Sequence, residues 1–375
     1  MTTPPARLAA LDGLRFAAAA AVVLYHLTAR TSSAWGPGQA DALGGAGRWT
    51  SYGSLGPELF FVVSGFVVLM SAWGRPTVHV VASRVARLYP AYWVAVLMTG
   101  GLLLVLWPEG KQVSAHQVLV NLTMVQSSLG VDHVDGVYWT LWTELRFYLL
   151  IGLFSLVGVT RRRVLAVVVL WPVAALVVER AGWDALATAL VSDYASLFAA
   201  GMALYLAFRP ADDGPRLGVA TWCAVVGNTL LAVWRVVPSR SEVLARTTGY
   251  EPSVLLLGVG VVVCVAAVAV VTLTPLARVD SRRLTAAGAL TYPLYLVHEY
   301  WGLYVVRLTS SWAPAAVSVA AAAAVALALA WLVHRGVERP LGPRLRAATE
   351  AGLVRARAVV LEPLTRGPRL LGLHG

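Results

Sequence analysis

Residues 253–275 read SVLLLGVGVVVCVAAVAVVTLTP, a stretch of 23 residues without one charged side chain. As a single helix, such a run is long enough to cross the hydrocarbon core of a bilayer, which is about 30 Å thick. Of the 375 residues in the chain, 58% are hydrophobic and 13% are charged. Soluble domains have about 45–50% apolar and about 25% charged residues. The composition therefore excludes a soluble globular protein and indicates a polytopic membrane protein.

Similar apolar runs recur along the chain and predict an all-α polytopic membrane helix bundle of about ten transmembrane helices. With a cytoplasmic N-terminus, 20 basic residues fall in the inside segments and 8 in the outside segments. The positive-inside rule then places both termini in the cytoplasm, in a multi-pass protein of a bacterial-type inner cell membrane. The spans are expected at residues 12–29, 54–73, 90–107, 138–158, 164–179, 188–208, 217–236, 253–275, 286–306 and 313–333.

We expect residues 1–335 to form the transmembrane domain and residues 336–375 to form a basic cytoplasmic C-terminal tail. Within this tail, apolar residues at helical spacing are flanked by arginines, which suits a helix lying on an anionic leaflet. A frayed basic tail fits the same composition, so both interpretations stay open. The net charge of +11 does not predict nucleic-acid binding, because the arginines lie between apolar runs and not in a basic stripe.

The first predicted span carries two ionisable residues, Arg15 and His26. Such side chains are costly in hydrocarbon and are candidates for function. Their separation of 11 residues brings them to within about 20° of one helix face and about 16 Å apart along the axis. A buried histidine that only satisfies an interhelical hydrogen bond is the alternative interpretation.

Two arginines, Arg84 and Arg87, lie three residues apart in SRVARLYPAYW on the predicted cytoplasmic side. At this spacing both guanidinium groups point the same way on a helix. Arginine forks bind phosphate oxygens bidentately, so the pair suits a phosphorylated cytosolic ligand. Positive-inside charge would also explain them.

The fourth predicted span carries Glu144, at a depth below the outer surface comparable to that of His26. A buried carboxylate there would orient the imidazole of His26 as the acid of a nucleophile–base–acid triad does. An ion pair with Arg146 or another intramembrane cation is the alternative. Glu58, His298 and Glu299 also lie near outer ends of spans, where they would line an acceptor cavity or face the headgroups.

Metal and disulfide sites are not expected. The loop 108–137 contains Asp132, His133 and Asp135, which resemble a metal cluster only loosely, and a solvated loop is the favoured interpretation. The two cysteines, Cys223 and Cys264, both lie inside apolar runs, where they are typical of small buried hydrophobic residues.

Several of these segments, in this order, resemble the acyltransferase-3 family of integral membrane O-acyltransferases. The resemblance rests on LDGLRFAAAAAVVLYH with its Arg-x10-His spacing, GPELFFVVSGF, SRVARLYPAYW, WTLWTELRFYL, and YPLYLVH followed by VERP. It covers roughly residues 8–340. It implies a ten-helix bundle that takes an acyl group from cytosolic acyl-CoA and passes it to a hydroxyl at or beyond the outer face.

The resemblance also implies roles for particular residues. His26 would be the catalytic base, Arg15 would lie beside it, Arg84 and Arg87 would contact the CoA phosphates, and Glu144 would be a further motif residue. The family commonly has Gly-Val-Asp-Leu-Phe-Phe where this chain has Gly-Pro-Glu-Leu-Phe-Phe, and the esterase-type domain fused to some members is absent. No permanently bound cofactor is implied, since acyl-CoA, expected to be acetyl-CoA, is a donor substrate.

The expected partners are acyl-CoA, a carbohydrate or glycosylated small-molecule acceptor and the lipid bilayer, with no nucleic acid. Two other classes of function stay open. A transporter or exporter of a sugar or lipid-linked glycan would use His26 and Glu144 as a proton relay. A non-catalytic membrane binding module would have kept the fold. Dependence on acyl-CoA distinguishes the enzyme from both.

Overall fold

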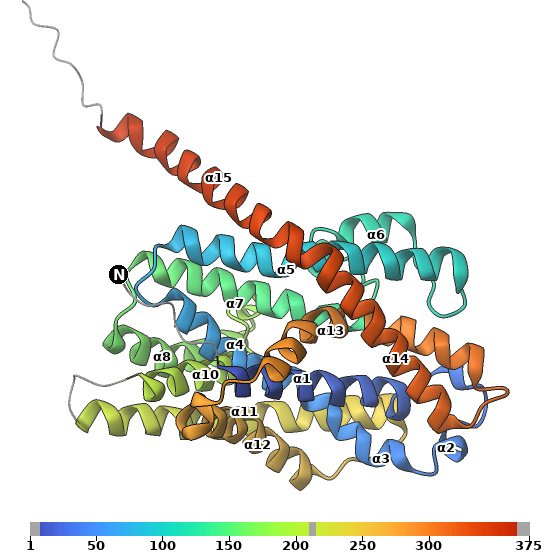
Figure 1. Cartoon of the computed structure of the whole chain (residues 1–375). Coiled ribbons are helices and arrows are strands. Elements are labelled where there is room, and N and C mark those ends of the chain that lie inside the picture. The colour runs from blue at the N-terminus through green and yellow to red at the C-terminus, as the bar shows by residue number, and fades with distance from the viewer. Residues whose placement is uncertain (1–7, 210–214, 366–375) are drawn as a thin grey trace, which may run out of the picture.

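The computed structural model describes residues 8–209 and 215–365, and within them it contains helices and no strands. The long helices pack side by side as a bundle (Figure 1). Those that overlap the ten predicted spans are α1 (Ala9–Leu24), α4 (Gly56–Ala72), α5 (Thr77–Gly101), α7 (Trp139–Leu156), α8 (Arg161–Arg180), α10 (Ala195–Phe208), α11 (Pro215–Thr248), α12 (Val254–Leu273), α13 (Arg282–Thr309) and α14 (Ala315–Val333).

Shorter helices and turns connect or extend the long ones. Three π-helical segments continue long helices: η1 (Tyr25–Ala29) after α1, η4 (Leu102–Leu106) after α5 and η8 (His334–Glu338) after α14. The remaining elements are η2 (Ser33–Trp35), α2 (Gln39–Ala42), α3 (Ala46–Thr50), η3 (Ser51–Leu55), α6 (Ala115–Asn121), η5 (Gln126–Leu129), η6 (Gly136–Tyr138), α9 (Asp184–Ala189), η7 (Pro275–Arg278) and α15 (Arg339–Thr365).

The helical bundle has the surface of a membrane protein. In the described residues, six helical segments are long and apolar enough to cross a bilayer: Ala9–Ala29, Ala46–Ala72, Thr77–Leu106, Gly218–Thr248, Val254–Leu273 and Ala315–Ala356. Large apolar side chains such as Leu170, Leu255 and Leu332 are exposed on the outer faces of the bundle, which suits contact with lipid. These features indicate a multi-pass membrane protein. The count of ten spans and the membrane sides of the termini stay predictions.

Three predicted spans differ clearly from the structure. The span expected to begin at 90 belongs to α5, which begins at Thr77, so Arg84 and Arg87 lie within a helix. The span expected at 188–208 is interrupted, because Val191 has a φ of 57° and α10 begins only at Ala195. The span expected to end at 236 continues to Thr248, so Arg240 lies within a helix and not in an outer loop. The helix carries this arginine because the carboxylate of Glu58, a fully buried residue, pairs with its guanidinium. A partner of opposite charge offsets much of the cost of burying a cation.

Helices α1 and α13 run side by side in the same direction although they are far apart in sequence. At one end, a Cβ on Gly13 would lie 2.8 Å from Leu284, and at the other a Cβ on Gly302 would lie 2.8 Å from Leu27. These glycines allow close packing along the whole contact. The parallel arrangement brings His26, in the π-helical segment η1 that continues α1, next to His298 of α13.

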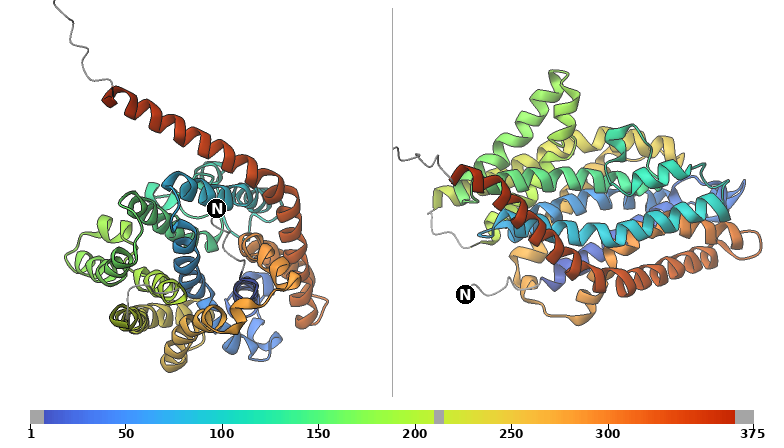
Figure 2. Two further views of the ribbon diagram at one scale, coloured as in Figure 1. Left: turned by 60° about the vertical axis from the view of Figure 1, so that its left-hand side comes forward. Right: turned by 90° about the horizontal axis from the view of Figure 1, so that it is seen from above.

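The C-terminal tail forms the helix α15, which packs against α5 and then extends beyond the bundle (Figures 1 and 2). Its basic residue Arg346 pairs with Glu350, and Glu350 also contacts His79 at the start of α5. The tail is helical from Arg339 to Thr365. Its position on a membrane surface stays a prediction.

Candidate functional site

The imidazole of His26 lies in a cluster built by η1 and α13. Its Nδ1 is 3.0 Å from the carbonyl oxygen of Val22 and 3.1 Å from Nε2 of His298. Its Nε2 is 3.6 Å from Oε2 of Glu299. All three ionisable side chains are buried. The segment η1, which carries His26, is π-helical, and this form is common at functional sites. The regular phase of α1 therefore does not continue to His26.

The contacts of the two histidines determine which ring nitrogen carries the proton. Nδ1 of His298 lies 2.8 Å from the carbonyl of Tyr295, which only accepts, so this nitrogen donates and Nε2 of a neutral His298 accepts. Nδ1 of His26 faces that Nε2 and the carbonyl of Val22, two acceptors, and must therefore be the donor. This leaves Nε2 of His26 with a free lone pair, the state that a general base requires.

Glu299 completes the cluster of His26, His298 and Arg30, called the outer cluster because the sequence predicts that this end of the bundle faces outward. Its Oε1 accepts a hydrogen bond from the guanidinium of Arg30, and its Oε2 is buried without a hydrogen-bond donor. The lone pair of His26 Nε2 and the orphaned Oε2 are both acceptors. Only a group that brings a proton, such as an attacking hydroxyl or the proton of an imidazolium, can satisfy them together. The carboxylate is thus placed to stabilise His26 once it has accepted a proton.

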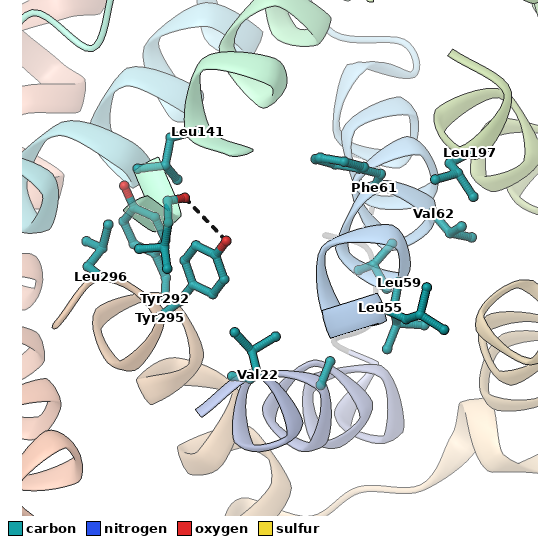
Figure 3. Packing of buried hydrophobic residues seen from close by; sticks show 14 of the residues in the cluster. Val22, Leu55, Leu59, Phe61, Val62, Leu141, Leu197, Tyr292, Tyr295 and Leu296 are labelled. Atoms are coloured by element: carbon teal, nitrogen blue, oxygen red, sulfur yellow. Dashed lines mark hydrogen bonds between the residues drawn. The ribbon is translucent and has the colours of Figure 1, made fainter. Parts of the chain in front are cut away.

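A cavity of about 280 Å³ lies between α1, α4, α5, α7 and α13. Phe61 of α4 stands across from Leu141 of α7 and from Tyr292 and Tyr295 of α13 (Figure 3). The charged side chains that line the cavity are those of Arg15, Arg84, Arg87 and Glu144. The structure therefore brings together four of the five site residues predicted from the sequence, and His26 lies outside this cavity wall.

Neither His26 nor Arg146 is the partner of Glu144 in the structure. Its Oε1 accepts hydrogen bonds from the hydroxyl of Ser64, at 2.8 Å, and from that of Tyr148. Arg146 instead donates to the carbonyl of Thr188. The carboxylate beside His26 is Glu299, because α13 and not α7 lies against that part of α1. Glu144 lines the same cavity as Arg15, Arg84 and Arg87.

The arginine pair on α5 faces inward along the cavity. The guanidinium carbon of Arg84 lies 5.6 Å from the ring centroid of Tyr148, and that of Arg87 lies 5.6 Å from the ring centroid of Tyr292. Arg87 also has an oxygen of Glu338 at 3.8 Å. The aromatic faces position the guanidinium planes but do not occupy all the N–H donors of the two arginines. Both guanidinium groups thus point toward the same cavity, as their spacing predicts.

A second cavity, of about 540 Å³, shares Arg15 and Arg87 with the first and adds Arg282 and Arg339. It lies where α13 and α15 begin, at the end of the bundle that the sequence assigns to the cytoplasm. Arg339 lies in the VERP motif, whereas Arg282 was treated only as a topological charge. The motif does not assign Arg339 to a site, and only the packing of α13 and α15 places both arginines in the wall of this cavity.

The two parts of the site are separated by one layer of side chains. Tyr295 lines the first cavity, and its ring centroid lies 5.7 Å from that of His298, which in turn contacts His26. The hydroxyl of Tyr295 is held by Thr140 at 3.0 Å. His26 therefore lies just beyond the end of the arginine-lined cavity at which Tyr295 lies.

The loop that loosely resembled a metal cluster does not assemble one. His133 has Gln126 Nε2 at 2.6 Å from its Nδ1 and the hydroxyl of Ser127 at 3.1 Å from its Nε2. Burial, together with Lys111, lowers the pKa of His133 to about 4. Asp135 points away from it into the protein, and among the described residues no group of three histidine, cysteine, aspartate or glutamate side chains could hold a metal ion.

Comparison with known proteins gave one informative result. A family model described as an acyltransferase domain matches residues 8–335, which include every residue of both cavities except Arg339 and all residues of the outer cluster. No curated protein and no solved structure matches the chain.

Proposed function

Since the chain belongs to the acyltransferase-3 family and is a membrane acyltransferase, we propose that it moves an acetyl group from cytosolic acetyl-CoA to a hydroxyl of a carbohydrate or glycosylated small molecule. His26 is the general base of this reaction. Arg15, Arg84 and Arg87 bind the donor. The observation that carries the proposal is the free Nε2 of His26, which lies beside a buried carboxylate at the end of an arginine-lined cavity.

The chemistry at the outer cluster is a direct acyl transfer. The acceptor hydroxyl gives its proton to Nε2 of His26 as its oxygen attacks the thioester carbonyl, and the new C–O bond forms while the C–S bond breaks. The imidazolium then returns the proton to the CoA thiolate, so no proton is gained or lost overall. Glu299 stabilises the imidazolium in between. General-base catalysis of this kind contributes about 10²- to 10⁴-fold.

The donor occupies the arginine-lined cavities. The guanidinium groups of Arg84 and Arg87 pair with phosphate oxygens of CoA, and Arg15, which lines both cavities, extends this positive surface inward. Small-molecule sites usually measure about 300–1,000 Å³, and the two adjoining cavities are of this order. Arg282 and Arg339 enlarge the phosphate-binding surface toward the cytoplasm. The thioester then reaches the end lined by Tyr295.

The acceptor approaches from the other end of the bundle, where His26 and Arg30 lie. Aromatic side chains gather there, with the ring centroids of Trp107 and Tyr304 separated by 5.9 Å and those of Trp107 and Tyr300 by 6.3 Å. Such residues suit contact with a sugar, and they also suit the membrane interface. The location in a cell membrane of bacterial type belongs to the same proposal.

Thermal unfolding of the purified protein in detergent, with increasing acetyl-CoA and free CoA, tests the donor site. A ligand that binds only the folded state raises the unfolding temperature in a saturable way. We expect this shift for the wild type and its loss in Arg84→Ala/Arg87→Ala. The matched control is Arg162→Ala/Arg163→Ala, which removes two arginines from the start of α8, outside both cavities.

The His26→Ala variant tests the base in the same preparation. We expect it to keep the shift with CoA and to lose turnover of acetyl-CoA. Normal turnover by His26→Ala would overturn the mechanism. Absence of a shift with either ligand in folded wild-type protein would contradict the acyltransferase proposal and favour a transporter, in which His26 acts in a proton relay.

A further inference from the structure

Asp135 lies next to Glu299 in the interior, although it precedes α7 and comes from an outer loop. It has no exposed surface, and its Oδ1 accepts a hydrogen bond from the backbone N–H of Val137 at 3.1 Å. A Cβ on the next residue, Gly136, would lie 3.2 Å from Oε2 of Glu299. The chain therefore passes directly over the carboxylate that faces His26.

The two carboxyl groups cannot both be ionised without a cost. The backbone beside Asp135 lies against Glu299, and Asp135 Oδ2 and Glu299 Oε2 are both buried without a donor. Two carboxylate oxygens bind each other only if one of them carries a proton. Like charges at such a distance in a buried site raise one pKa strongly. A single shared proton would satisfy both orphaned oxygens.

The surrounding charges decide which of the two groups holds the proton. Glu299 accepts from Arg30 and faces His26, and both contacts favour its ionised form. Among the described residues no ion pair joins Asp135 to a cation: Lys111, which donates to the carbonyl of His133 at 2.6 Å, and Arg30, which pairs with Glu299, act on Asp135 only from a longer distance. Burial and the neighbouring carboxylate raise the pKa of Asp135 well above its usual range.

We propose that Asp135 is a positioning residue that is protonated in the folded protein and donates a hydrogen bond to the carboxylate of Glu299, which it holds against His26. No proton is transferred through it. Its hydroxyl fixes one carboxylate oxygen while Arg30 fixes the other, so the carboxylate is oriented from both sides. The consequence for the reaction rests on the proposed function, whereas the location of the proton does not.

Infrared difference spectroscopy on the purified protein at neutral pH tests the location of the proton. We expect a stretching band of a protonated carboxyl group in the wild type that is lost in Asp135→Asn. The matched control is Asp132→Asn, three residues earlier in the same loop and exposed, which should leave the band in place. An unchanged band in Asp135→Asn, or no such band in the wild type, would overturn the inference.

Turnover of acetyl-CoA, with methyl glucoside as the hydroxyl probe, tests the positioning role. Asp135→Asn keeps the backbone contact with Val137 and supplies an N–H donor, while Asp135→Ser keeps the backbone contact but is too short to reach Glu299. We expect Asp135→Asn to retain kcat within about threefold. In Asp135→Ser, kcat should fall at least about tenfold, as for the loss of a hydrogen bond to a charged group, with KM for acetyl-CoA unchanged.

The two measurements separate the possible failures. Equal loss of kcat in both variants would show that the negative charge of Asp135 is needed. Full activity of Asp135→Ser would show that the contact between Asp135 and Glu299 is not needed. Either result overturns the positioning role. No turnover by the wild type, with the carboxyl band present and lost in Asp135→Asn, would overturn the proposed function and leave the protonated Asp135 standing.

Discussion

Glu144 and Glu299 are both buried or half-buried glutamates in predicted spans, yet their neighbours give them different tasks. Glu299 lies beside Nε2 of His26 and pairs with Arg30. Glu144 is held by Ser64 and Tyr148 in the wall of the cavity that also contains Arg84. The residue type and depth in the span do not distinguish them, and only the neighbouring helices do.

Replacing each glutamate by glutamine should therefore change different kinetic constants. Glu299→Gln removes the charge that stabilises the imidazolium, so we expect kcat to fall on the order of 10²-fold or more with little change in KM for acetyl-CoA. Glu144→Gln alters the donor cavity, so its main effect should be on KM for acetyl-CoA. Steady-state kinetics of the two variants checks this. A larger loss of kcat in Glu144→Gln than in Glu299→Gln would restore Glu144 as the partner of His26.

At the scale of elements, the contact between α4 and α10 depends on two glycines. A Cβ on Gly65 would lie 2.1 Å from the carbonyl oxygen of Phe198, and a Cβ on Gly201 would lie 1.9 Å from that of Val62. Both obstructing atoms belong to the backbone and cannot rotate away. Small residues that let helix backbones meet are a general feature of membrane helix packing. Because α4 also carries Phe60, Phe61 and Ser64 into the donor cavity, this contact supports the site.

We expect Gly65→Ala and Gly201→Ala each to lower the unfolding temperature in detergent, with a destabilisation of about 1–3 kcal/mol typical of overpacking. The matched control is Gly227→Ala on α11, where a Cβ meets nothing within 4 Å. This control should be neutral or slightly stabilising, since alanine favours helix over glycine. Unfolding temperatures that match the wild type for both Gly65→Ala and Gly201→Ala would contradict the close contact.

At the scale of the whole molecule, the second cavity and the outer cluster lie toward opposite ends of the bundle, and the first cavity lies between them. The second cavity is lined by the first residues of α13 and α15, whereas His26, Arg30 and Glu299 lie toward the other ends of α1 and α13. A donor from one side and an acceptor from the other would thus meet within the protein. This arrangement requires the orientation that the distribution of arginines predicts.

Single cysteines in a background without Cys223 and Cys264 test this orientation. Glu109 follows η4 and is exposed, and Arg162 lies exposed at the start of α8. In intact cells, we expect a membrane-impermeant maleimide to label Glu109→Cys, and to label Arg162→Cys only after permeabilisation. The reverse pattern would invert the membrane sides of both substrates, and labelling of both positions in intact cells would contradict the predicted span 138–158, which lies between them.

Much of the fold follows from local properties of the sequence. A long apolar run without charges must satisfy its own backbone hydrogen bonds in lipid, so each of the predicted spans overlaps helical structure. Arg15 and Glu144, selected as ionisable residues inside predicted spans, and Arg84 and Arg87, selected as a pair at helical spacing, line one cavity. The predicted boundaries were wrong near Arg240, which a buried ion pair holds within a helix, and near Val191, whose positive φ interrupts a helix.

The sequence by itself determined that this is an all-helical membrane protein with the motifs of an acyltransferase, because apolar run length and motif spacing are local quantities. The tertiary structure alone decided that His26 faces His298 and Glu299, which are about 270 residues away along the chain, and that Asp135 covers that carboxylate. The physical reason is that helices from distant parts of a chain meet through side-chain packing. Such packing depends on the shapes and charges of both helices, so the spacing of residues within one helix does not predict it.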